Sequence, residues 1–383
     1  MNETDRQSLA AARLSTRLFF FLAGFANAAW APMVPFAKAR TGLGTSALGL
    51  VLMGLGVGAA AVMPVIAWAL RRHGSRRTMI AGAILVTFVL PLLAILANPA
   101  ALALALLCFG FGIGGLDAAM NAQAVEVEIL SRKPLMSGFH GMFSLGGLAA
   151  SLGLTLLLGA GLSVLGAALV VTLLFLGVWL WRAGTLLPGR ERPHASGRRP
   201  GWSIALHPLV LLIGALCVVG FLGEGAALDW SALFLAQKGL PASYGGLGYA
   251  AFSVAMVAGR LSGDRMTRRM GARFMLRASA VVGMAGWAAA VGLPGPFALF
   301  GFCLVGLGAA NIVPLLFSAA ARVPGVPPSV SIPIISALGY AGLLCGPAIV
   351  GFVAGATSLG LALLLVGLLL LAVLSGAKVA PGR

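Results

Sequence analysis

Long apolar runs dominate this chain of 383 residues. A helix that crosses about 30 Å of hydrocarbon needs about 20 mainly apolar residues. Only 9% of the residues are charged, against about 25% in an average soluble protein, so most of the outer surface must face lipid. Twelve stretches have the length and composition of membrane spans, at approximately residues 17–37, 46–70, 78–97, 101–127, 138–159, 162–182, 208–236, 243–261, 274–293, 296–320, 329–353 and 356–376. The sequence therefore predicts an all-α integral membrane protein with twelve transmembrane helices.

The Lys and Arg residues indicate how these spans are oriented. There are 26 of them against 9 Asp and Glu, a formal net charge of +17. Cytoplasmic loops of membrane proteins are enriched in Lys and Arg. With the amino terminus inside, 23 of the 26 lie on the cytoplasmic side, all except Lys38, Arg40 and Lys238. We therefore expect both termini to be cytoplasmic. Because the chain lacks a basic stripe with interleaved aromatic residues, we do not expect it to bind nucleic acid.

A polar stretch in the middle divides the chain. The segment AGTLLPGRERPHASGRRPGWS, residues 183–203, is rich in Pro, Gly and Arg, a composition typical of a flexible linker. It lies between the sixth and seventh predicted spans. We therefore predict an amino-terminal six-helix bundle at residues 1–182, a cytoplasmic linker at 183–207 and a carboxy-terminal six-helix bundle at 208–383.

Two basic, Gly-containing connections suggest an internal repeat. RRHGSRR, residues 71–77, joins the second and third spans, and GRLSGDR, residues 259–265, which closes with GAR, residues 271–273, joins the eighth and ninth. Their matching positions indicate a duplicated six-helix unit. A cytoplasmic Asp held by Arg and by a helix end can lock two helices in one state. We therefore predict gating residues in these connections, or, alternatively, basic residues that only anchor the loops inside. The predicted gating residues are Gly74, Gly259, Asp264, Arg265 and Gly271.

These connections resemble those of the major facilitator superfamily, and the resemblance covers essentially the whole chain. The family's inner loop has the pattern G-x-x-x-D-R-x-G-(R/K)-(R/K), which the second connection matches well, whereas in the first Arg71 stands where the family has an acidic residue. The stretches 120–123, 138–141 and 223–231 further resemble a bacterial branch related to fucose-type sugar permeases. The resemblance implies two bundles that rock about a central site lined by spans one, four, seven and ten.

Three carboxylates lie well inside the predicted spans: Asp117, Glu224 and Asp229. A charged side chain in the membrane costs about 2.5–3.5 kcal/mol on insertion scales, so it usually marks a transport pathway. We expect no Lys or Arg to be available at membrane depth to neutralise Asp117 or Glu224, and an isolated buried carboxyl is a natural proton carrier. We predict that all three are proton-coupling residues. The alternative is a protonated carboxyl that only hydrogen-bonds between helices.

Neutral polar residues occur in the same spans. Span one contains Asn27 and Trp30, span four contains Asn121, and span ten contains Asn311 together with Pro314. A proline inside a helix frees a backbone carbonyl that can accept a hydrogen bond. We predict that Asn27, Trp30, Asn121 and Asn311 bind the substrate. The alternative is that these residues pack helices against one another.

The sequence as a whole predicts a secondary active transporter of the cytoplasmic (inner) membrane. We expect proton-coupled symport of a small sugar- or polyol-like solute by a monomer that needs neither cofactor nor metal ion. One alternative is proton-driven efflux of an amphipathic compound. Another, from a different class, is a non-transporting membrane receptor. We do not expect an enzyme, because the sequence has no HExxH motif, no GxSxG motif with membrane partners and no Walker loop.

Overall fold

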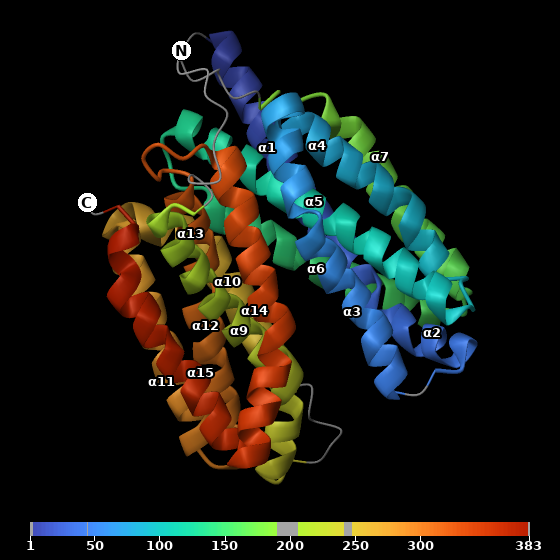
Figure 1. Ribbon diagram of the computed structural model, residues 1–383, viewed down its shortest axis with the longest axis vertical. Coiled ribbons are helices and arrows are strands. Elements are labelled where there is room, and N and C mark those ends of the chain that lie inside the picture. The colour runs from blue at the N-terminus through green and yellow to red at the C-terminus, as the bar shows by residue number, and fades with distance from the viewer. Residues whose placement is uncertain (1–2, 44, 190–205, 241–246, 382–383) are drawn as a thin grey trace. The chain divides into compact units, whose positions relative to one another are not determined.

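The computed structural model describes residues 3–43, 45–189, 206–240 and 247–381, and every element in these ranges is helical. The helices form two compact units, each a bundle in which helices run side by side (Figure 1). The first unit comprises Met1–Lys133 and Met142–Arg199, and the second comprises Pro134–Gly141 and Pro200–Arg383. The predicted linker at 183–207 falls mostly outside the described residues.

The first unit begins with a helix that is longer at its start than the apolar run predicts. α1 begins at Glu3 instead of residue 17, because the polar amino-terminal residues continue the same helix. It ends at Ala29, short of residue 37, since Pro32 lacks the N–H that a continuing helix requires. The other elements are η1 (Ala31–Met33), α2 (Val34–Thr41), α3 (Thr45–Ala61), α4 (Met63–Leu93), α5 (Pro99–Ser131), α6 (Met136–Gly159) and α7 (Val164–Ala183).

The second unit contains one predicted span that is split into two helices. The stretch 296–320 forms η3, α12 and α13, with Ala310 and Asn311 between the last two. The remaining predicted spans of this half each contain one long helix. The elements are α9 (Pro208–Gln237), α10 (Leu247–Met270), α11 (Ala272–Gly292), η3 (Gly295–Phe297), α12 (Ala298–Ala309), α13 (Ile312–Ala320), α14 (Pro328–Ala356), α15 (Leu359–Gly376) and η4 (Ala377–Val379).

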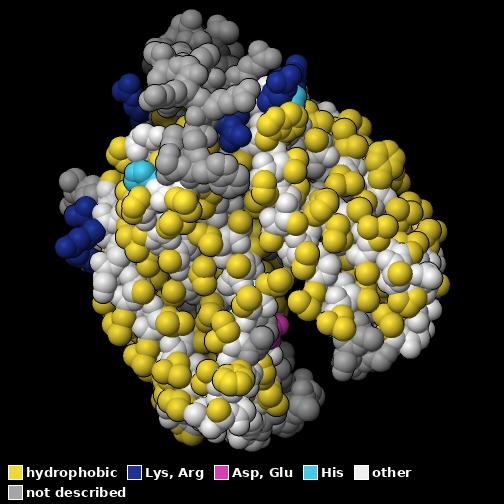
Figure 2. All heavy atoms as spheres, viewed as in Figure 1, with side chains coloured by type: hydrophobic (Ala, Val, Ile, Leu, Met, Phe, Trp, Pro, Cys, Tyr) yellow, Lys and Arg dark blue, Asp and Glu magenta, His cyan; other side chains and the backbone are white. Residues whose placement is uncertain are grey.

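Within the described residues, 10 helical segments are long and apolar enough to cross a membrane. One of them, Leu50–Leu93, has 44 residues, which at 1.5 Å per residue is about 66 Å, enough for two crossings. Large apolar side chains point outward, including Phe88 (71% exposed), Val254 (71%) and Phe352 (82%). On the visible face hydrophobic side chains cover most of both units, and Lys and Arg appear only in a few small patches (Figure 2). This is the surface of a multi-pass membrane protein.

Each unit turns between its second and third predicted spans at a glycine. Gly74 has φ 80° and ψ 171°, and Gly271 has φ 87° and ψ 151°. Only glycine adopts this conformation readily. The matching turns support the internal repeat, and they place the turn of the second connection at its closing residues. Residues 259–265 are helical, because α10 continues to Met270 and only Gly271 separates it from α11.

Two basic residues on the predicted outer side have the same structural role in the two units. Arg40 donates to two carbonyl oxygens at the carboxyl end of α4, at 2.9 Å each. Lys238 donates to the oxygens of Val291 and Leu293, at 2.7 and 2.6 Å, at the end of α11. A cation at a helix carboxyl end satisfies orphan carbonyls and complements the helix dipole. These residues depart from the cytoplasmic pattern because they cap helices.

Close contact through small residues holds α11 against α12. A Cβ atom added at Gly301 would lie 2.1 Å from the backbone nitrogen of Ala290. One added at Gly308 would lie 2.4 Å from the nitrogen of Gly283. Without a hydrophobic drive between helices in lipid, such backbone contact is a principal source of helix association. It positions the end of α12, where the helical chain breaks.

Candidate functional site

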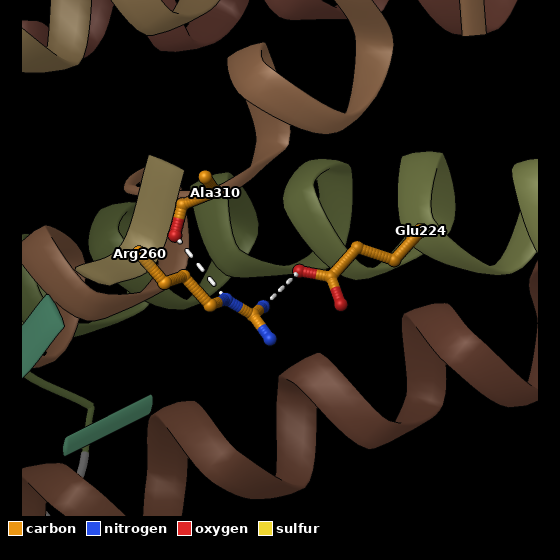
Figure 3. A network of polar contacts seen from close by, with 3 residues as sticks. All are labelled: Glu224, Arg260 and Ala310. Carbon is orange, nitrogen blue, oxygen red and sulfur yellow. Dashed lines mark hydrogen bonds and ion pairs between the residues drawn. The ribbon is translucent and has the colours of Figure 1, made fainter. Parts of the chain in front are cut away.

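The break between α12 and α13 leaves a backbone carbonyl without its helical donor. Pro314 lies four residues after Ala310 and has no N–H to offer that residue's oxygen. Arg260 of α10 supplies the missing donor: its Nε donates to the Ala310 oxygen at 3.3 Å (Figure 3). The carbonyl that Pro314 leaves free is thus bound by a side chain of the protein.

Arg260 also forms an ion pair with Glu224 of α9. Its Nη2 donates to Glu224 Oε1 at 2.9 Å, and the two side chains are 8% and 19% exposed. Figure 3 shows the guanidinium between the carboxylate on one side and the Ala310 carbonyl on the other. The expectation that no Lys or Arg is available to neutralise Glu224 is therefore wrong. The error arose because residue 260 was assigned to a cytoplasmic connection, whereas α10 remains helical for ten residues beyond it.

Asn311 connects the same break to α10. Its Nδ2 donates to the Gly259 oxygen at 3.2 Å, and the residue is 3% exposed. Among the described residues its Oδ1 has no hydrogen-bond partner. A Cβ atom at Gly263 would lie 1.9 Å from that oxygen, and one at Gly259 would lie 2.7 Å from the Ala310 Cβ. Two predicted site residues, Gly259 and Asn311, therefore form one close contact, and glycine leaves the space for it.

Asp264 lies one turn after Arg260 and binds the start of another helix. Its Oδ2 accepts a hydrogen bond from the Gly138 N–H at 3.0 Å, in the first turn of α6. A carboxylate is favourable at a helix amino terminus. The first turn of α6 belongs to the second unit, whereas the same helix from Met142 onward belongs to the first. Arg265, the next predicted gating residue, is exposed.

The two carboxylates of α9 lie in different surroundings. Asp229 is exposed, whereas the carboxylate of Glu224 is largely buried against Arg260. Trp230, next to Asp229, packs on α14, where a Cβ atom at Gly351 would lie 3.1 Å from its ring. Residues five apart on a helix project about 140° from each other, which explains the difference.

The first unit holds a polar pair on α5. Asn121 Nδ2 donates to the backbone oxygen of Asp117 at 2.9 Å and to its Oδ1 at 3.3 Å. Asn121 is fully buried and Asp117 is half-buried. The two residues are four apart and therefore lie on the same face of α5. On α1, Asn27 is half-buried, and Trp30, directly after the helix, is 6% exposed.

Gly74 lies against the chain that leaves α7. A Cβ atom there would lie 2.2 Å from the Pro188 oxygen. The neighbouring Ser75 hydrogen-bonds the fully buried side chain of Gln123. In this unit the predicted gating glycine is therefore enclosed by residues of the same unit.

Comparison with known proteins agrees with this architecture. The sequence profile of the Major Facilitator Superfamily matches residues 18–332. The chain belongs to the major facilitator superfamily. An uncharacterized MFS-type transporter of Yersinia pestis is 42% identical to this transporter over 371 residues, which cover 96% of this chain and 95% of the relative.

Solved structures share the fold of this transporter. The outward conformation of FucP superposes with a TM-score of 0.81 at 16% identity and covers 98% of this chain and 100% of FucP. A second structure of FucP, described as the fucose:proton symporter of E. coli, has a TM-score of 0.76 at 18% identity, covering 97% of this chain and 98% of FucP. The proton:xylose symporter XylE, bound to 6-bromo-6-deoxy-D-glucose, has a TM-score of 0.78 at 14% identity and covers 98% of this chain and 96% of XylE.

Arg260 is the residue of this site that was not predicted from the sequence. It directly follows the apolar run YAAFSVAMVAG and is continuous with it, although the turn-forming residues Ser262, Gly263 and Asp264 come soon after. That continuity was the available signal that Arg260 lies inside a helix. Its partner could not be read from the sequence, because Glu224 is 36 residues away on another helix.

Proposed function

We propose that this transporter takes up a sugar- or polyol-like solute together with protons. Alternating access would involve two six-helix bundles of twelve spans in total, in the cytoplasmic membrane, with both termini inside. The observation that supports the proposal is the ion pair of Glu224 and Arg260 beside the broken helix. Discontinuous helices at membrane depth are typical of transporter binding sites.

A buried ion pair suits proton coupling because its strength depends on the charge of the acid. With Glu224 ionised, the pair is neutral overall and joins α9 to α10. Protonation removes the charge that faces the guanidinium, and the two helices lose their strongest polar link. An acid whose charge changes in this way shifts the equilibrium between two arrangements of a helix bundle. The descriptions of FucP and XylE as proton symporters of sugars provide further support.

The other predicted residues have roles consistent with the same proposal. Asp117, with Asn121, would provide a protonatable group in the first unit, and Asp229 one at the exposed part of α9. The proposed substrate ligands are Asn27, Trp30, Asn121 and Asn311. The proposed gate centres on Asp264, whose bond to Gly138 holds the start of α6 in the second unit. Gly74, Gly259, Arg265 and Gly271 complete it.

The test begins with ligand identification by thermal shift of the purified protein against sugars, polyols, amino acids and hydrophobic cations, because a ligand stabilises the state that binds it. Stabilisation by sugars or polyols supports the proposal. Stabilisation by hydrophobic cations alone would instead indicate efflux.

Uptake into proteoliposomes then tests coupling. Glu224→Gln should abolish accumulation driven by an inward proton gradient but retain exchange of labelled for unlabelled substrate. Glu126→Gln, a carboxylate change elsewhere in the chain, is the control and should accumulate substrate normally. Accumulation by Glu224→Gln with unchanged pH dependence would show that Glu224 does not couple transport to protons.

A further inference from the structure

The ion pair also bears on the charge of the substrate. Arg260 is a permanent cation, since a guanidinium does not lose its proton in proteins. It lies ten residues before the end of α10, about 15 Å along the helix axis. Its two defined bonds differ in kind: Nε is held by the Ala310 carbonyl, and Nη2 by the Glu224 carboxylate. One bond orients the guanidinium permanently, and the other depends on a proton.

We infer that Arg260 is a substrate anchor and that the transported solute is a polyhydroxylated monocarboxylate, the chemical class of the sugar acids. The inference rests on the proposed function and narrows its substrate class. A proton that binds Glu224 releases Nη2, and the carboxylate of the solute takes the place of Glu224 on the guanidinium.

The surroundings of Glu224 make charge balance decisive. The helices α12, α13, α14 and α15 carry no charged residue. Among the described residues, the titratable groups near the pair are Tyr249 on α10, Tyr340 on α14, which stacks on Phe221 one turn from Glu224, and His140 near Arg260. Asp229, also on α9, is exposed and projects about 140° away from Glu224. In such apolar surroundings an ion that loses its counter-charge is strongly destabilised. A proton on Glu224 therefore creates a demand for one new negative charge.

A monoanion meets that demand and a neutral polyol does not. Binding one proton and one carboxylate changes the net charge of the site by zero, so the two ligands favour each other's binding. A guanidinium is also the side chain best suited to a carboxylate, since its planar fork donates two parallel hydrogen bonds. The Ala310 carbonyl already orients this fork, so exchanging one carboxylate for another requires no backbone rearrangement.

The relative exposure of the two side chains is consistent with this exchange. The acid is 19% exposed and the guanidinium 8% exposed. The proton acceptor is therefore the more accessible partner, and the cation behind it becomes available when the acid moves. An ion pair with only a structural role does not require the acid to be more exposed than the guanidinium.

Binding of D-gluconate and of D-glucitol to the purified full-length protein provides the first test. The two compounds have the same six-carbon chain, and glucitol has a hydroxymethyl group in place of the carboxylate. Gluconate should bind more tightly as pH falls from 7.5 to 6, by up to about tenfold per pH unit for one linked proton. Glu224→Gln should bind gluconate with an affinity that does not change with pH.

The double variant Glu224→Gln and Arg260→Gln removes both charges and so avoids leaving one ion buried alone. It should keep its thermal stability and lose at least tenfold in gluconate affinity. Arg273→Gln, which removes an arginine bound to the Ala380 backbone, is the control and should bind gluconate as the unmodified protein does. Equal gluconate affinity in the double variant and the unmodified protein would overturn the inference, as would failure of both gluconate and D-galacturonate to bind at pH 6.

Transport in proteoliposomes separates this inference from the proposed function. Symport of one proton with a monoanion moves no net charge, so an imposed pH gradient should drive gluconate uptake and a valinomycin-imposed potential should not alter it. Proton-driven uptake of glucitol that increases with a negative-inside potential would support the proposed function and overturn the carboxylate assignment. Gluconate uptake that does not respond to the pH gradient would contradict both.

Discussion

Replacing Gly301 by alanine tests how far the second unit depends on backbone contact between α11 and α12. The added Cβ would lie 2.1 Å from the Ala290 nitrogen and 2.4 Å from its Cα. Ordinary van der Waals contact of a Cβ begins at 3.4 Å, so the two helices must separate locally by about 1.3 Å. Both contact atoms belong to the backbone, and no rotamer change can relieve the clash.

The cost follows from the contacts that such a separation weakens. A gap of about 0.5–1 Å forfeits a quarter to a half of the ~0.1–0.2 kcal/mol well of each atom pair. For a few tens of pairs along the interface this gives about 1–3 kcal/mol, which is also the usual cost of overpacking a close-packed core. In a domain of about 150–250 residues, 1 kcal/mol corresponds to about 2–4 °C in Tm. We expect Gly301→Ala to lower Tm by about 3–8 °C.

Tryptophan fluorescence during heating of the detergent-purified protein measures this shift. Gly292→Ala is the matched control, because Gly292 lies in α11 and a Cβ there would have no atom within 4 Å. It should leave Tm within about 1 °C, since surface changes usually alter stability by less than ~0.5 kcal/mol. If Gly301→Ala proves as stable as Gly292→Ala, the argument that backbone contact holds these helices together is refuted.

Three further predictions concern the capping residues, the repeated turns and the helix break. Arg40→Met and Lys238→Met should each cost about 1–2 kcal/mol, because each removes charged hydrogen bonds to two carbonyls at a helix end; unchanged Tm values in both would show that these caps do not stabilise the fold. Gly74→Ala should cost about 3 kcal/mol or more, since it combines a positive φ with a Cβ 2.2 Å from the Pro188 oxygen, and Gly271→Ala should cost about 1–3 kcal/mol because of its positive φ alone. The control Gly184→Ala, at φ −63° with nothing within 4 Å, should be neutral. Equal Tm values in all three variants would show that the two turns do not require glycine. Pro314→Ala should restore an N–H donor four residues after Ala310 and so weaken the bond between the Ala310 oxygen and Arg260. We expect reduced transport with a Tm within about 2 °C of the unmodified protein. Unimpaired uptake would show that the helix break has no role in transport.

Much of the fold could be predicted because the membrane leaves few alternatives. A lipid-facing backbone must satisfy its hydrogen bonds within each segment, so apolar runs of about 20 residues indicate helices without any tertiary information. The prediction erred at the ends of elements. α1 begins earlier because a polar sequence can extend a helix into water, and α10 continues past Arg260 through the turn-forming residues Ser262, Gly263 and Asp264. Composition alone could not distinguish an arginine at the end of a span from one inside it.

The predicted repeat also shows the difference between a motif and its structure. Comparison of the two basic connections suggested that residues 259–265 correspond to residues 71–77. The backbone matches Gly74 with Gly271, the residue that closes the second connection, and the two share a conformation that other residues avoid. Arg40 and Lys238 form a second correspondence, which only the structure shows, because each caps a helix more than 50 residues further along the chain.

By itself the sequence determined the class of molecule, since scarce charges and long apolar runs leave a bundle of membrane helices as the solution, and it selected Glu224 as a carboxylate at membrane depth. Only the tertiary structure decided whether that carboxylate is isolated or part of an ion pair. The crossing of α9, α10 and the break after α12 brings Glu224 and the Ala310 carbonyl to the same guanidinium. An isolated acid and an ion pair have opposite electrostatic consequences, and which of the two exists depends on how the helices pack, because the partners are too far apart in sequence for any local pattern to join them.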